Sequence, residues 1–295
     1  MQNHNTRTVL ITGGTGGIGL HSAIGIAKTG ATLLVTGRNA DRGHAARDTI
    51  AQASDNPRIQ FIQGDLSSIR GIDALASAVS SHTDTLDVLV NNAGYFGDQL
   101  QQNDDGLELH FAVNVLAPWR LTHALLPLLK TAPQARVINV SGGDKPAAID
   151  PDNLQAEKGF KGLLTYKHSK SVLEAASMCL ARDLESEGIC VNIVFPGRAS
   201  TAMTQGLSPQ ALPGAMKLMY PFFRLFFRED GGKSAAKASH STIWAATTPE
   251  LEGVTGAYFD THGTRQSLHA SAYDADVHTR IIQTLTAAQS SHPAP

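Results

Sequence analysis

A glycine-rich turn near the start of the chain constrains the fold more than any other stretch. Residues 8–11 form a short apolar run, typical of a buried parallel strand, that stops at glycines, and a helix-like stretch follows over residues 20–29. A strand, a glycine turn and a helix in succession can bind a dinucleotide, because backbone N–H groups and the helix N-terminus face its pyrophosphate. The glycines fit two patterns, G-x-G-x-x-G through Gly14, Gly16 and Gly19, and T-G-x-x-x-G-x-G through Gly13, Gly17 and Gly19.

The alternation of strand-like and helix-like stretches continues along the chain. Apolar runs at residues 31–36, 59–62 and 86–90 are separated by helical stretches of βαβ length, and further runs follow at 136–141 and 189–195. Such connections join parallel strands in a sheet that helices cover on both faces. The sequence therefore predicts an α/β fold with a doubly wound parallel sheet.

The end of the second predicted strand indicates which dinucleotide fits. An acidic residue about 20 positions after the glycines would bind a ribose 2′-OH and favour NAD, but Gly37 and Arg38 occupy this place. A guanidinium binds a 2′-phosphate through charge-assisted hydrogen bonds, and Arg42 and Arg47 follow nearby. Arg38 could instead be a solvated side chain at a strand end. Of the two readings, we expect NADP(H) binding.

Two more predicted strands end in polar residues or glycine. Asp65, followed by Leu66, comes after the third strand, where its carboxylate could accept from an adenine amino group or cap the next helix. Asn92, Ala93 and Gly94 follow the fourth strand, and residues of this kind form a tight turn that lets backbone approach a ligand.

Tyr166 and Lys170 are four residues apart, a spacing that places both side chains on one face of a helix. A free tyrosine has a pKa of about 10, and a nearby ammonium favours the phenolate. We therefore expect Lys170 to lower the pKa of Tyr166. In this pair Tyr166 would be the proton donor, and Lys170 would adjust its acidity. A pair at this spacing also occurs by chance on many helices.

The chain resembles the short-chain dehydrogenase/reductase family from about Thr8 to about Phe259. Three motifs carry the resemblance in the family's order, Thr12-Gly13…Gly17-Ile18-Gly19, Asn91-Asn92-Ala93-Gly94 and Tyr166…Lys170. The resemblance implies a Rossmann-type domain that moves a hydride between NAD(P)H and a carbonyl or alcohol carbon. It also implies that Tyr166 gives the proton to the carbonyl oxygen and that Lys170 holds the nicotinamide ribose. Residues 153–158 and 249–259 are similar to segments of retinol dehydrogenase-like members.

The family pattern implies further site residues. Asn114 matches the asparagine that helps to hold the lysine and a water chain for proton exchange. The turn at Pro196 and Gly197 implies backbone contacts to nicotinamide near Ala199, and Thr201 matches a phosphate-contacting threonine. The candidate cofactor contacts are Gly13, Thr15, Gly17, Ile18, Gly19, Arg38, Asp65, Leu66, Asn92, Ala93, Gly94, Tyr166, Lys170, Pro196, Gly197, Ala199 and Thr201.

The chain departs from the family pattern at the end of the fifth predicted strand. Family members have two serines there, of which the second polarises the substrate carbonyl, whereas this chain has Ser141 and then Gly142. In a regular strand Ser141 would point to the opposite face. Either the strand ends early and Ser141 swings in as a catalytic residue, or another group substitutes, or the reaction needs no such donor. Losing one donor of this type typically costs about 10²–10³ in rate.

Residues at about 202–230, after the sixth predicted strand, have no place in the sheet. Aromatic residues concentrate at 216–228 in a chain that is only 6% aromatic. The segment could form an apolar lid over the substrate, and we favour this interpretation. It could instead contact another subunit or the core, or it could bind to a membrane surface. We assign residues 1–262 to one Rossmann-type catalytic domain that includes this lid. A tail at 263–295 follows, with a helix around 275–287.

Composition argues against several other classes of protein. A formal net charge of −2 offers no electrostatic footprint for nucleic acid. Two cysteines, Cys179 and Cys190, provide no metal-ligand cluster, and reduced thiols suit a cytoplasmic protein. The polar N-terminus and the lack of about 20 consecutive apolar residues predict neither a secretory signal nor a transmembrane segment. The small residues at 175–177 would pack on the sheet or against another subunit of a homodimer or homotetramer.

We therefore expect an NADP(H)-dependent oxidoreductase that acts on a carbonyl or alcohol group of a fairly apolar small molecule. Its expected catalytic residues are Tyr166, Lys170, Asn114 and Ser141. One alternative is an NADP(H)-binding sensor or scaffold with weakened catalysis, which Gly142 motivates. Another is non-redox chemistry on the same fold, such as dehydration or epimerisation.

Overall fold

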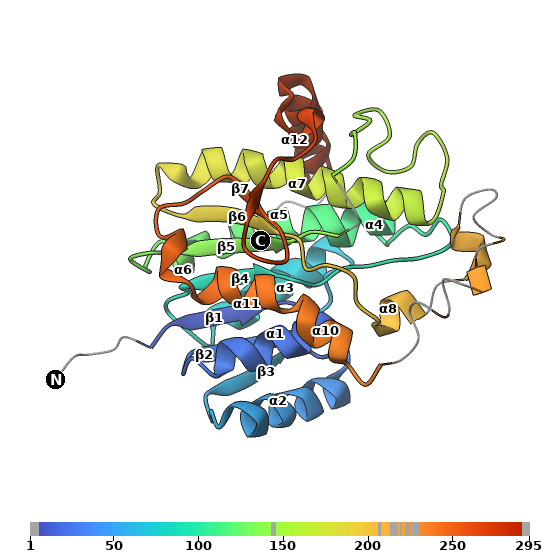
Figure 1. Ribbon diagram of the computed structural model, residues 1–295. Coiled ribbons are helices and arrows are strands. Elements are labelled where there is room, and N and C mark those ends of the chain that lie inside the picture. Colours follow the sequence, from blue (N-terminus) through green and yellow to red (C-terminus); the bar gives the residue numbers. More distant parts are fainter. Residues whose placement is uncertain are drawn as a thin grey trace.

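The computed structural model describes residues 6–142, 146–205, 208–212, 218, 220, 221, 225 and 230–290. Within these ranges an eight-stranded sheet forms the centre of the molecule, in the order β3-β2-β1-β4-β5-β6-β7-β8 (Figure 1). Strands β1 to β7 are parallel, and β8 pairs antiparallel with β7. The strands are β1 Thr8–Ile11, β2 Thr32–Gly37, β3 Ile59–Gln63, β4 Val88–Asn91, β5 Arg136–Val140, β6 Cys190–Val194, β7 Ala257–Phe259 and β8 Arg265–Gln266.

Helices cover both faces of this sheet. Helices α1, α2, α10 and α11 pack together on one face, and α3, α5, α7 and α12 pack together on the other. The longer helices are α1 Gly17–Ala27, α2 Ala40–Ser54, α3 Ile69–Ser80, α5 Ala117–Ala124, α7 Leu163–Glu185, α11 His240–Thr247 and α12 Ala275–Ser290. The shorter ones are α4 Leu109–Phe111, η1 Ala112–Leu116, α6 Leu126–Leu129, α8 Ala202–Gln205, η2 Pro209–Ala211, α10 Lys233–Ala238, η4 Pro249–Leu251 and η5 Ala270–Tyr273.

The central strands are apolar along their whole length because both of their faces are buried. Leu10, Leu34 and Leu89 belong to the hydrophobic cluster beneath α3, α5 and α7, whereas the alternate residues Val9 and Leu33 belong to the cluster beneath α1 and α11. This two-sided burial is typical of parallel sheets. The predicted α/β fold with a doubly wound parallel sheet is therefore confirmed.

The strand order determines where a ligand can bind. β1 pairs with β2 on one side and with β4 on the other, so the chain order reverses between β1 and β4. In open α/β sheets, ligands bind beyond the carboxyl ends of the strands at such a point. The glycine turn after β1 and the Asn-Ala-Gly turn after β4 both lie there.

The C-terminal segment packs into the main body of the protein. α12, at the top of Figure 1, packs against α7, and its residues Val277, Ile281 and Leu285 are part of the cluster beneath α7. The helix expected around 275–287 is confirmed, although the division of the chain at residue 262 stays a prediction. Most of the predicted lid at about 202–230 lies outside the described residues.

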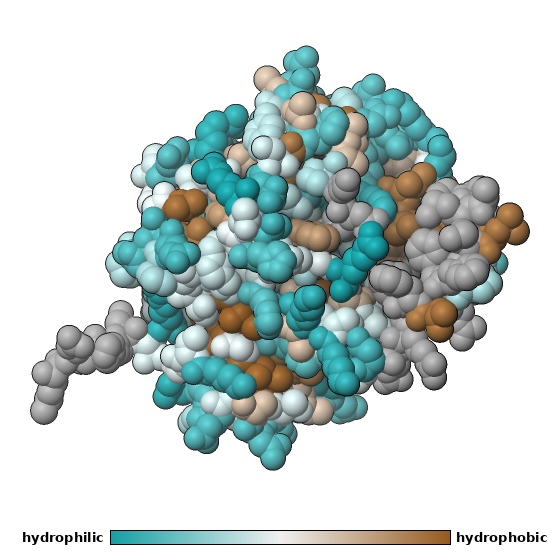
Figure 2. Space-filling model, in the orientation of Figure 1, coloured by the Kyte–Doolittle hydropathy of each residue, from teal (hydrophilic) through white to brown (hydrophobic). Residues whose placement is uncertain are grey.

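Within the described ranges, every helix is too short or too polar to cross a bilayer. The face seen in Figure 2 is mainly hydrophilic, with small separate hydrophobic patches. Residues 175–177, considered as a subunit contact, are buried against the chain's own sheet and helices.

Candidate active site

The backbone of the glycine turn distinguishes the two glycine patterns. Gly13 and Gly17 have φ angles of 65° and 51°, in the left-handed region that glycine tolerates and other residues rarely adopt. Gly16, which belongs only to the other pattern, has extended backbone with φ of −177°. The turn therefore follows the T-G-x-x-x-G-x-G pattern, and α1 begins at its second glycine.

The N-terminus of α1 is suited to an anion. The helix has eleven residues, no side-chain cap and no acidic residue in its first turn, so its N–H groups and dipole favour negative charge there. Thr201 lies against this turn: a Cβ atom placed on Gly17 would be only 3.1 Å from the methyl carbon of Thr201. Ile18 packs against a small cluster that contains Ala199. The structure thus brings together the turn and the segment after β6.

The end of β4 is tied to the same turn. The side-chain amide of Asn92 donates to the carbonyls of Thr12 and Gly13, at 2.9 and 3.3 Å. The hydroxyl of Thr12 accepts from the backbone N–H groups of Asn92 and Ala93, both at 3.0 Å. These bonds hold Ala93 and the following Gly94 beside the mouth of the glycine turn.

The end of β2 lies on the other side of the turn. Thr15 packs against Gly37, since a Cβ on Gly37 would be 2.6 Å from the Thr15 methyl carbon. Arg38 is exposed at the strand end, and the guanidinium of Arg42 reaches to 3.5 Å from where a Cβ on Gly16 would be. Two cationic groups are therefore available to a negatively charged group at this edge.

Other predicted contacts at this edge have different surroundings. The guanidinium of Arg47 binds Asp48 at 2.6 Å. The carboxylate of Asp65 remains exposed beyond β3, while Leu66 is buried in the core. The alternative in which Asp65 caps the next helix is wrong, because the hydroxyl of Ser68 is the cap of α3.

Tyr166 and Lys170 lie one turn apart on α7 and both face the end of β5. The Nζ of Lys170 donates to the carbonyl of Val140 at 3.1 Å. A Cβ placed on Gly142 would be 2.6 Å from the Tyr166 hydroxyl and 3.4 Å from Cε of Lys170. The phenol and the lysine stem therefore border the same point beyond β5, as their spacing predicts.

The ionisation of this pair differs from the expectation. Burial raises the pKa of Tyr166 to about 12 and lowers the pKa of Lys170 to about 8. The expected lowering of the tyrosine pKa by Lys170 is wrong for this structure, because the ammonium binds the Val140 carbonyl and loss of water around the phenol dominates. A phenol with a raised pKa is fully protonated at neutral pH, and it is a weaker acid than a free tyrosine.

Ser141 does not swing toward the tyrosine. Its hydroxyl donates to Oε1 of Glu174 at 2.5 Å, and both side chains are buried. β5 keeps its regular register through Asn139 and Val140, so the next side chain points to the α7 side instead of into the opening beyond the strand. Of the three alternatives considered for the missing serine, the inward rotation of Ser141 is therefore contradicted.

Asn114 connects the β4 loop with α7. It lies in the π-helical segment η1, and such segments are frequent at functional sites. Its Oδ1 accepts from the backbone N–H of Tyr95 at 2.8 Å, and its Nδ2 donates to the Tyr95 carbonyl and to the Ser169 hydroxyl. Ser169 in turn donates to the Tyr166 carbonyl at 2.7 Å. Asn114 thus fixes the loop after β4 to the turn of α7 that carries Tyr166.

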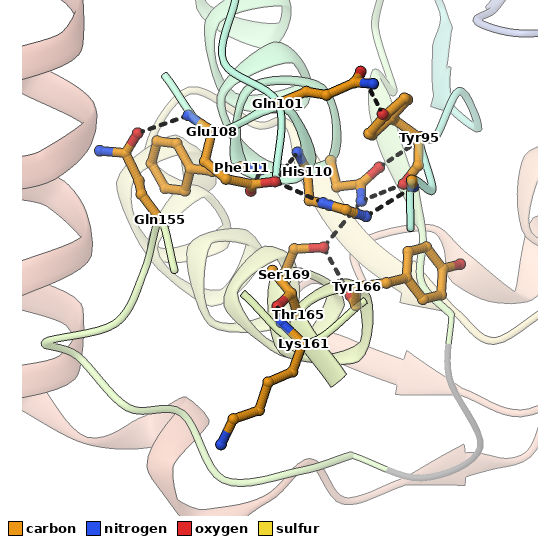
Figure 3. A network of polar contacts seen from close by, with 12 residues as sticks. Tyr95, Gln101, Glu108, His110, Phe111, Gln155, Lys161, Thr165, Tyr166 and Ser169 are labelled. Atoms are coloured by element: carbon orange, nitrogen blue, oxygen red, sulfur yellow. Dashed lines mark hydrogen bonds and ion pairs between the residues drawn. The ribbon is translucent and has the colours of Figure 1, made fainter. Parts of the chain in front are cut away.

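A buried pair that the sequence did not reveal supports the same loop. Nδ1 of His110 lies 2.6 Å from a carboxylate oxygen of Glu108, and its Nε2 accepts from the N–H of Gly97 at 3.1 Å (Figure 3). Because Nε2 accepts, Nδ1 carries the proton. The Phe96 ring, next to Gly97, meets the Tyr166 ring edge-on at 5.5 Å. The only sequence signal was an acidic residue before a short helix, which many helices share.

The segment after β6 completes the site. Gly197 has φ of 88°, so the chain turns sharply after Pro196, and a Cβ there would be 2.9 Å from the Thr261 methyl carbon. The turn directs residues 198–201 back toward α1. Glu174, the partner of Ser141, is a second residue that sequence analysis missed, although it lies four residues after Lys170.

Comparisons with known proteins agree with this arrangement. Residues 7–212 match the short chain dehydrogenase family. The chain is 32% identical to mouse retinol dehydrogenase 13 over 280 residues, covering 93% of this chain and 81% of that protein. It is also 32% identical to human polyprenol dehydrogenase over 272 residues, covering 90% of this chain and 80% of that protein.

Solved structures show the same fold. The Pseudomonas aeruginosa RhlG/NADP active-site complex is 28% identical, with a TM-score of 0.61 over 88% of this chain and 97% of that one. Together with the glycine turn, the Asn-Ala-Gly turn and the paired tyrosine and lysine, these similarities cover nearly the whole chain. The protein is thus a member of the short-chain dehydrogenase/reductase family, in its retinol dehydrogenase-like subgroup, and an NAD(P)-dependent oxidoreductase.

Proposed function

We propose that the protein transfers a hydride between NADP(H) and the carbonyl or alcohol carbon of a fairly apolar small molecule, with Tyr166 as the acid and base. The observation that supports this most directly is the convergence of the Tyr166 hydroxyl and Lys170 beyond β5. This point is on the same edge of the sheet as the glycine turn. A substrate oxygen at this edge would meet a protonated phenol.

The fit of the cofactor rests on the turn itself. α1 offers an uncapped N-terminus to a pyrophosphate, and Thr201 lies beside it. Arg38 and Arg42 favour NADP(H) over NAD(H), because guanidinium groups bind a 2′-phosphate. The proposed contacts are Gly13, Thr15, Gly17, Ile18, Gly19, Arg38, Asp65, Leu66, Asn92, Ala93, Gly94, Tyr166, Lys170, Pro196, Gly197, Ala199 and Thr201.

Each catalytic side chain has a distinct task in this proposal. When bound, the nicotinamide supplies or accepts the hydride. Tyr166 gives its proton to the carbonyl oxygen in reduction and takes it back from the alcohol in oxidation. Lys170 holds a buried positive charge beside the phenol and the ribose, and Asn114 holds the β4 loop in register with α7. Ser141 has no direct task, because its hydroxyl is committed to Glu174.

An apolar substrate is supported by the aromatic surroundings of the tyrosine. Phe96 lies edge-on to Tyr166, and Phe160 lies 5.6 Å from the His110 ring in the same cluster. The relatives are named for retinol and polyprenol, which are long apolar alcohols. Of the described leucines in the segment at about 202–230, Leu212 is buried, whereas Leu218 and Leu225 are exposed and available to cover an apolar ligand.

The cellular setting is part of the same proposal. Both cysteines, Cys179 and Cys190, are free thiols, which suits the cytoplasm. A homodimer or homotetramer stays a prediction, and residues 175–177 cannot supply its contacts because the chain itself buries them.

The test is a carbonyl panel assayed with NADPH and with NADH. We expect NADPH oxidation with long apolar aldehydes such as retinal, and little with a short aldehyde. Arg38→Ala should raise the KM for NADPH about tenfold or more, because a charged hydrogen bond to the phosphate is lost, and leave the KM for NADH unchanged. Arg47→Ala is the matched control. Equal use of both cofactors would refute the NADP(H) preference.

Two further outcomes would overturn the proposed chemistry. Tight NADPH binding without reduction of any panel compound would indicate a sensor. Loss of substrate at constant NADPH absorbance would indicate non-redox chemistry.

A further inference from the structure

The inner face of α7 carries a third ionisable side chain in line with Tyr166 and Lys170. Glu174 follows Lys170 by four residues, so the three side chains occupy successive turns of one helix face. Glu174 is 2% exposed and Lys170 is 4% exposed. Ionised groups this deep are costly unless they are paired and hydrogen-bonded. The proposed mechanism so far gives this carboxylate no task.

The end of β5 contacts both Lys170 and Glu174. The carbonyl of Val140 accepts from the ammonium of Lys170, and the next residue, Ser141, donates its hydroxyl to Glu174. From β7, the phenol of Tyr258 has a raised pKa, mainly because it is buried and also because the Glu174 charge lies nearby. These groups form a compact polar cluster behind the catalytic tyrosine, within otherwise apolar surroundings.

We propose that Glu174 is a positioning residue for the reaction: held by Ser141, its carboxylate keeps Lys170 charged and bound to the Val140 carbonyl, beside the working phenol. This inference rests on the proposed function of Tyr166 and Lys170. Glu174 acts only through the lysine and meets neither substrate nor cofactor. It also gives Ser141 a role that differs from polarising a carbonyl.

The charge balance of the cluster agrees with this role. Burial lowers the pKa of Lys170 to about 8, and the charge of Glu174 opposes that shift. Burial raises the pKa of Glu174 to about 7, while the Ser141 hydrogen bond and Lys170 oppose it. Each group therefore favours the ionised form of the other, and both titrate close to neutral pH. Without the carboxylate, desolvation would act on the lysine alone.

The decisive experiment measures the titration of Lys170 directly in the full chain. Protein labelled with ¹³Cε-lysine is titrated by NMR, and the Lys170 signal is assigned with Lys170→Arg. Glu174→Gln keeps the size of the side chain and an acceptor for Ser141 but removes the charge. We expect the pKa of Lys170 to fall by about one unit or more. An unchanged Lys170 titration would overturn the proposal.

Controls separate the charge from the fold. Glu185→Gln removes an exposed carboxylate from the same helix and should leave the Lys170 titration unchanged. Glu174→Asp keeps a carboxylate, so the pKa of Lys170 should lie between its values in the wild type and in Glu174→Gln. If Glu174→Gln does not fold, Ser141→Ala provides the test. It removes the donor that stabilises the carboxylate, so the infrared band of the protonated Glu174 should persist to higher pH, and an unmoved band would refute the proposed link.

Activity gives an independent readout. The alkaline limb of the kcat profile should move to lower pH in Glu174→Gln by the same amount as the NMR titration, with the KM for NADPH changed less than the rate. Because the NMR experiment needs neither substrate nor cofactor, it can fail while the proposed function holds. Conversely, it can succeed in a protein that reduces no carbonyl on the panel.

Discussion

Replacing Gly142 tests whether the Tyr166 hydroxyl occupies its working position. Gly142 is not among the glycines with positive φ, so alanine adds only a methyl group at this position. That methyl would be 2.6 Å from the Tyr166 hydroxyl and 3.3 Å from Cγ of Lys170. To regain an ordinary contact of 3.4 Å, the hydroxyl must withdraw by about 0.8 Å.

The effect of this displacement on rate can be large. A misplacement of about 1 Å costs roughly 10²-fold when a catalytic group no longer meets the reacting atom. We therefore expect Gly142→Ala to lower kcat by about 10²-fold. Stability should change by only about 1 kcal/mol, because the displaced atom is the far end of a side chain and not part of the backbone.

Gly142→Ser is the matched comparison. It places the same Cβ in the same contact but adds the hydroxyl that other family members carry at this position. A donor of this kind contributes about 10²–10³ in rate, so Gly142→Ser should be at least tenfold faster than Gly142→Ala. The difference between the two variants isolates the hydroxyl from the crowding.

The assay is steady-state reduction of the best panel carbonyl at saturating NADPH, with the Kd for NADPH from quenching of protein fluorescence. Wild-type kcat in Gly142→Ala would refute the reasoning, because the observed position of the phenol would then not be the working one. A loss that appears in the Kd instead of kcat would indicate distortion of the cofactor site.

Three further predictions concern stability, each measured by urea denaturation. Asp73→Asn should lower the free energy of unfolding by about 2–3 kcal/mol, because the largely buried guanidinium of Arg120 loses its bidentate carboxylate partner. Glu187→Gln, which removes an exposed ion pair with Lys130, should lower it by less than about 0.5 kcal/mol. Equal losses in the two variants would contradict this prediction. Burial raises the pKa of Glu174 from 4.5 in the unfolded chain to about 7 in the native protein, so the native state binds this proton more tightly. This stabilises the native state fully below pH 4.5, and the stabilisation is lost as the pH rises through 7. The free energy of unfolding should therefore fall by about 3 kcal/mol from pH 4.5 to 7. Glu174→Gln should remove this slope, and an unchanged slope would assign it elsewhere. His110→Leu should cost about 2 kcal/mol or more, because it leaves the Gly97 N–H without its acceptor and removes the ring donor from the buried Glu108 carboxylate, which keeps its two backbone donors; a smaller loss would mean that water replaces the ring.

The fold could be predicted from the sequence because its signals are local and repeated. Each buried parallel strand is a continuous apolar run, and each is followed by a turn and a helix of standard length. The glycine turn was ambiguous in sequence, since five glycines fit two patterns. Only the backbone angles at Gly13 and Gly17 resolve it.

The site was less predictable because its energetics depend on burial and on partners distant in sequence. The spacing of Tyr166 and Lys170 predicted their common face, but not that the ammonium binds the Val140 carbonyl and that desolvation raises the phenol pKa. The bond between Ser141 and Glu174 joins residues 33 positions apart, and no local pattern announces it. The C-terminal helix likewise shows its own periodicity but not the face of α7 that it covers.

Tyr166 is the proposed proton donor on which the whole reaction depends, and a single-turnover experiment tests this role most directly. Tyr166→Phe loaded with NADPH is mixed with the best panel carbonyl, and the nicotinamide absorbance is followed. We predict a Kd for NADPH close to that of the wild type and a hydride-transfer rate lower by at least about 10²-fold, because the substitution removes the proposed proton donor. Hydride transfer at the wild-type rate in Tyr166→Phe would contradict the account.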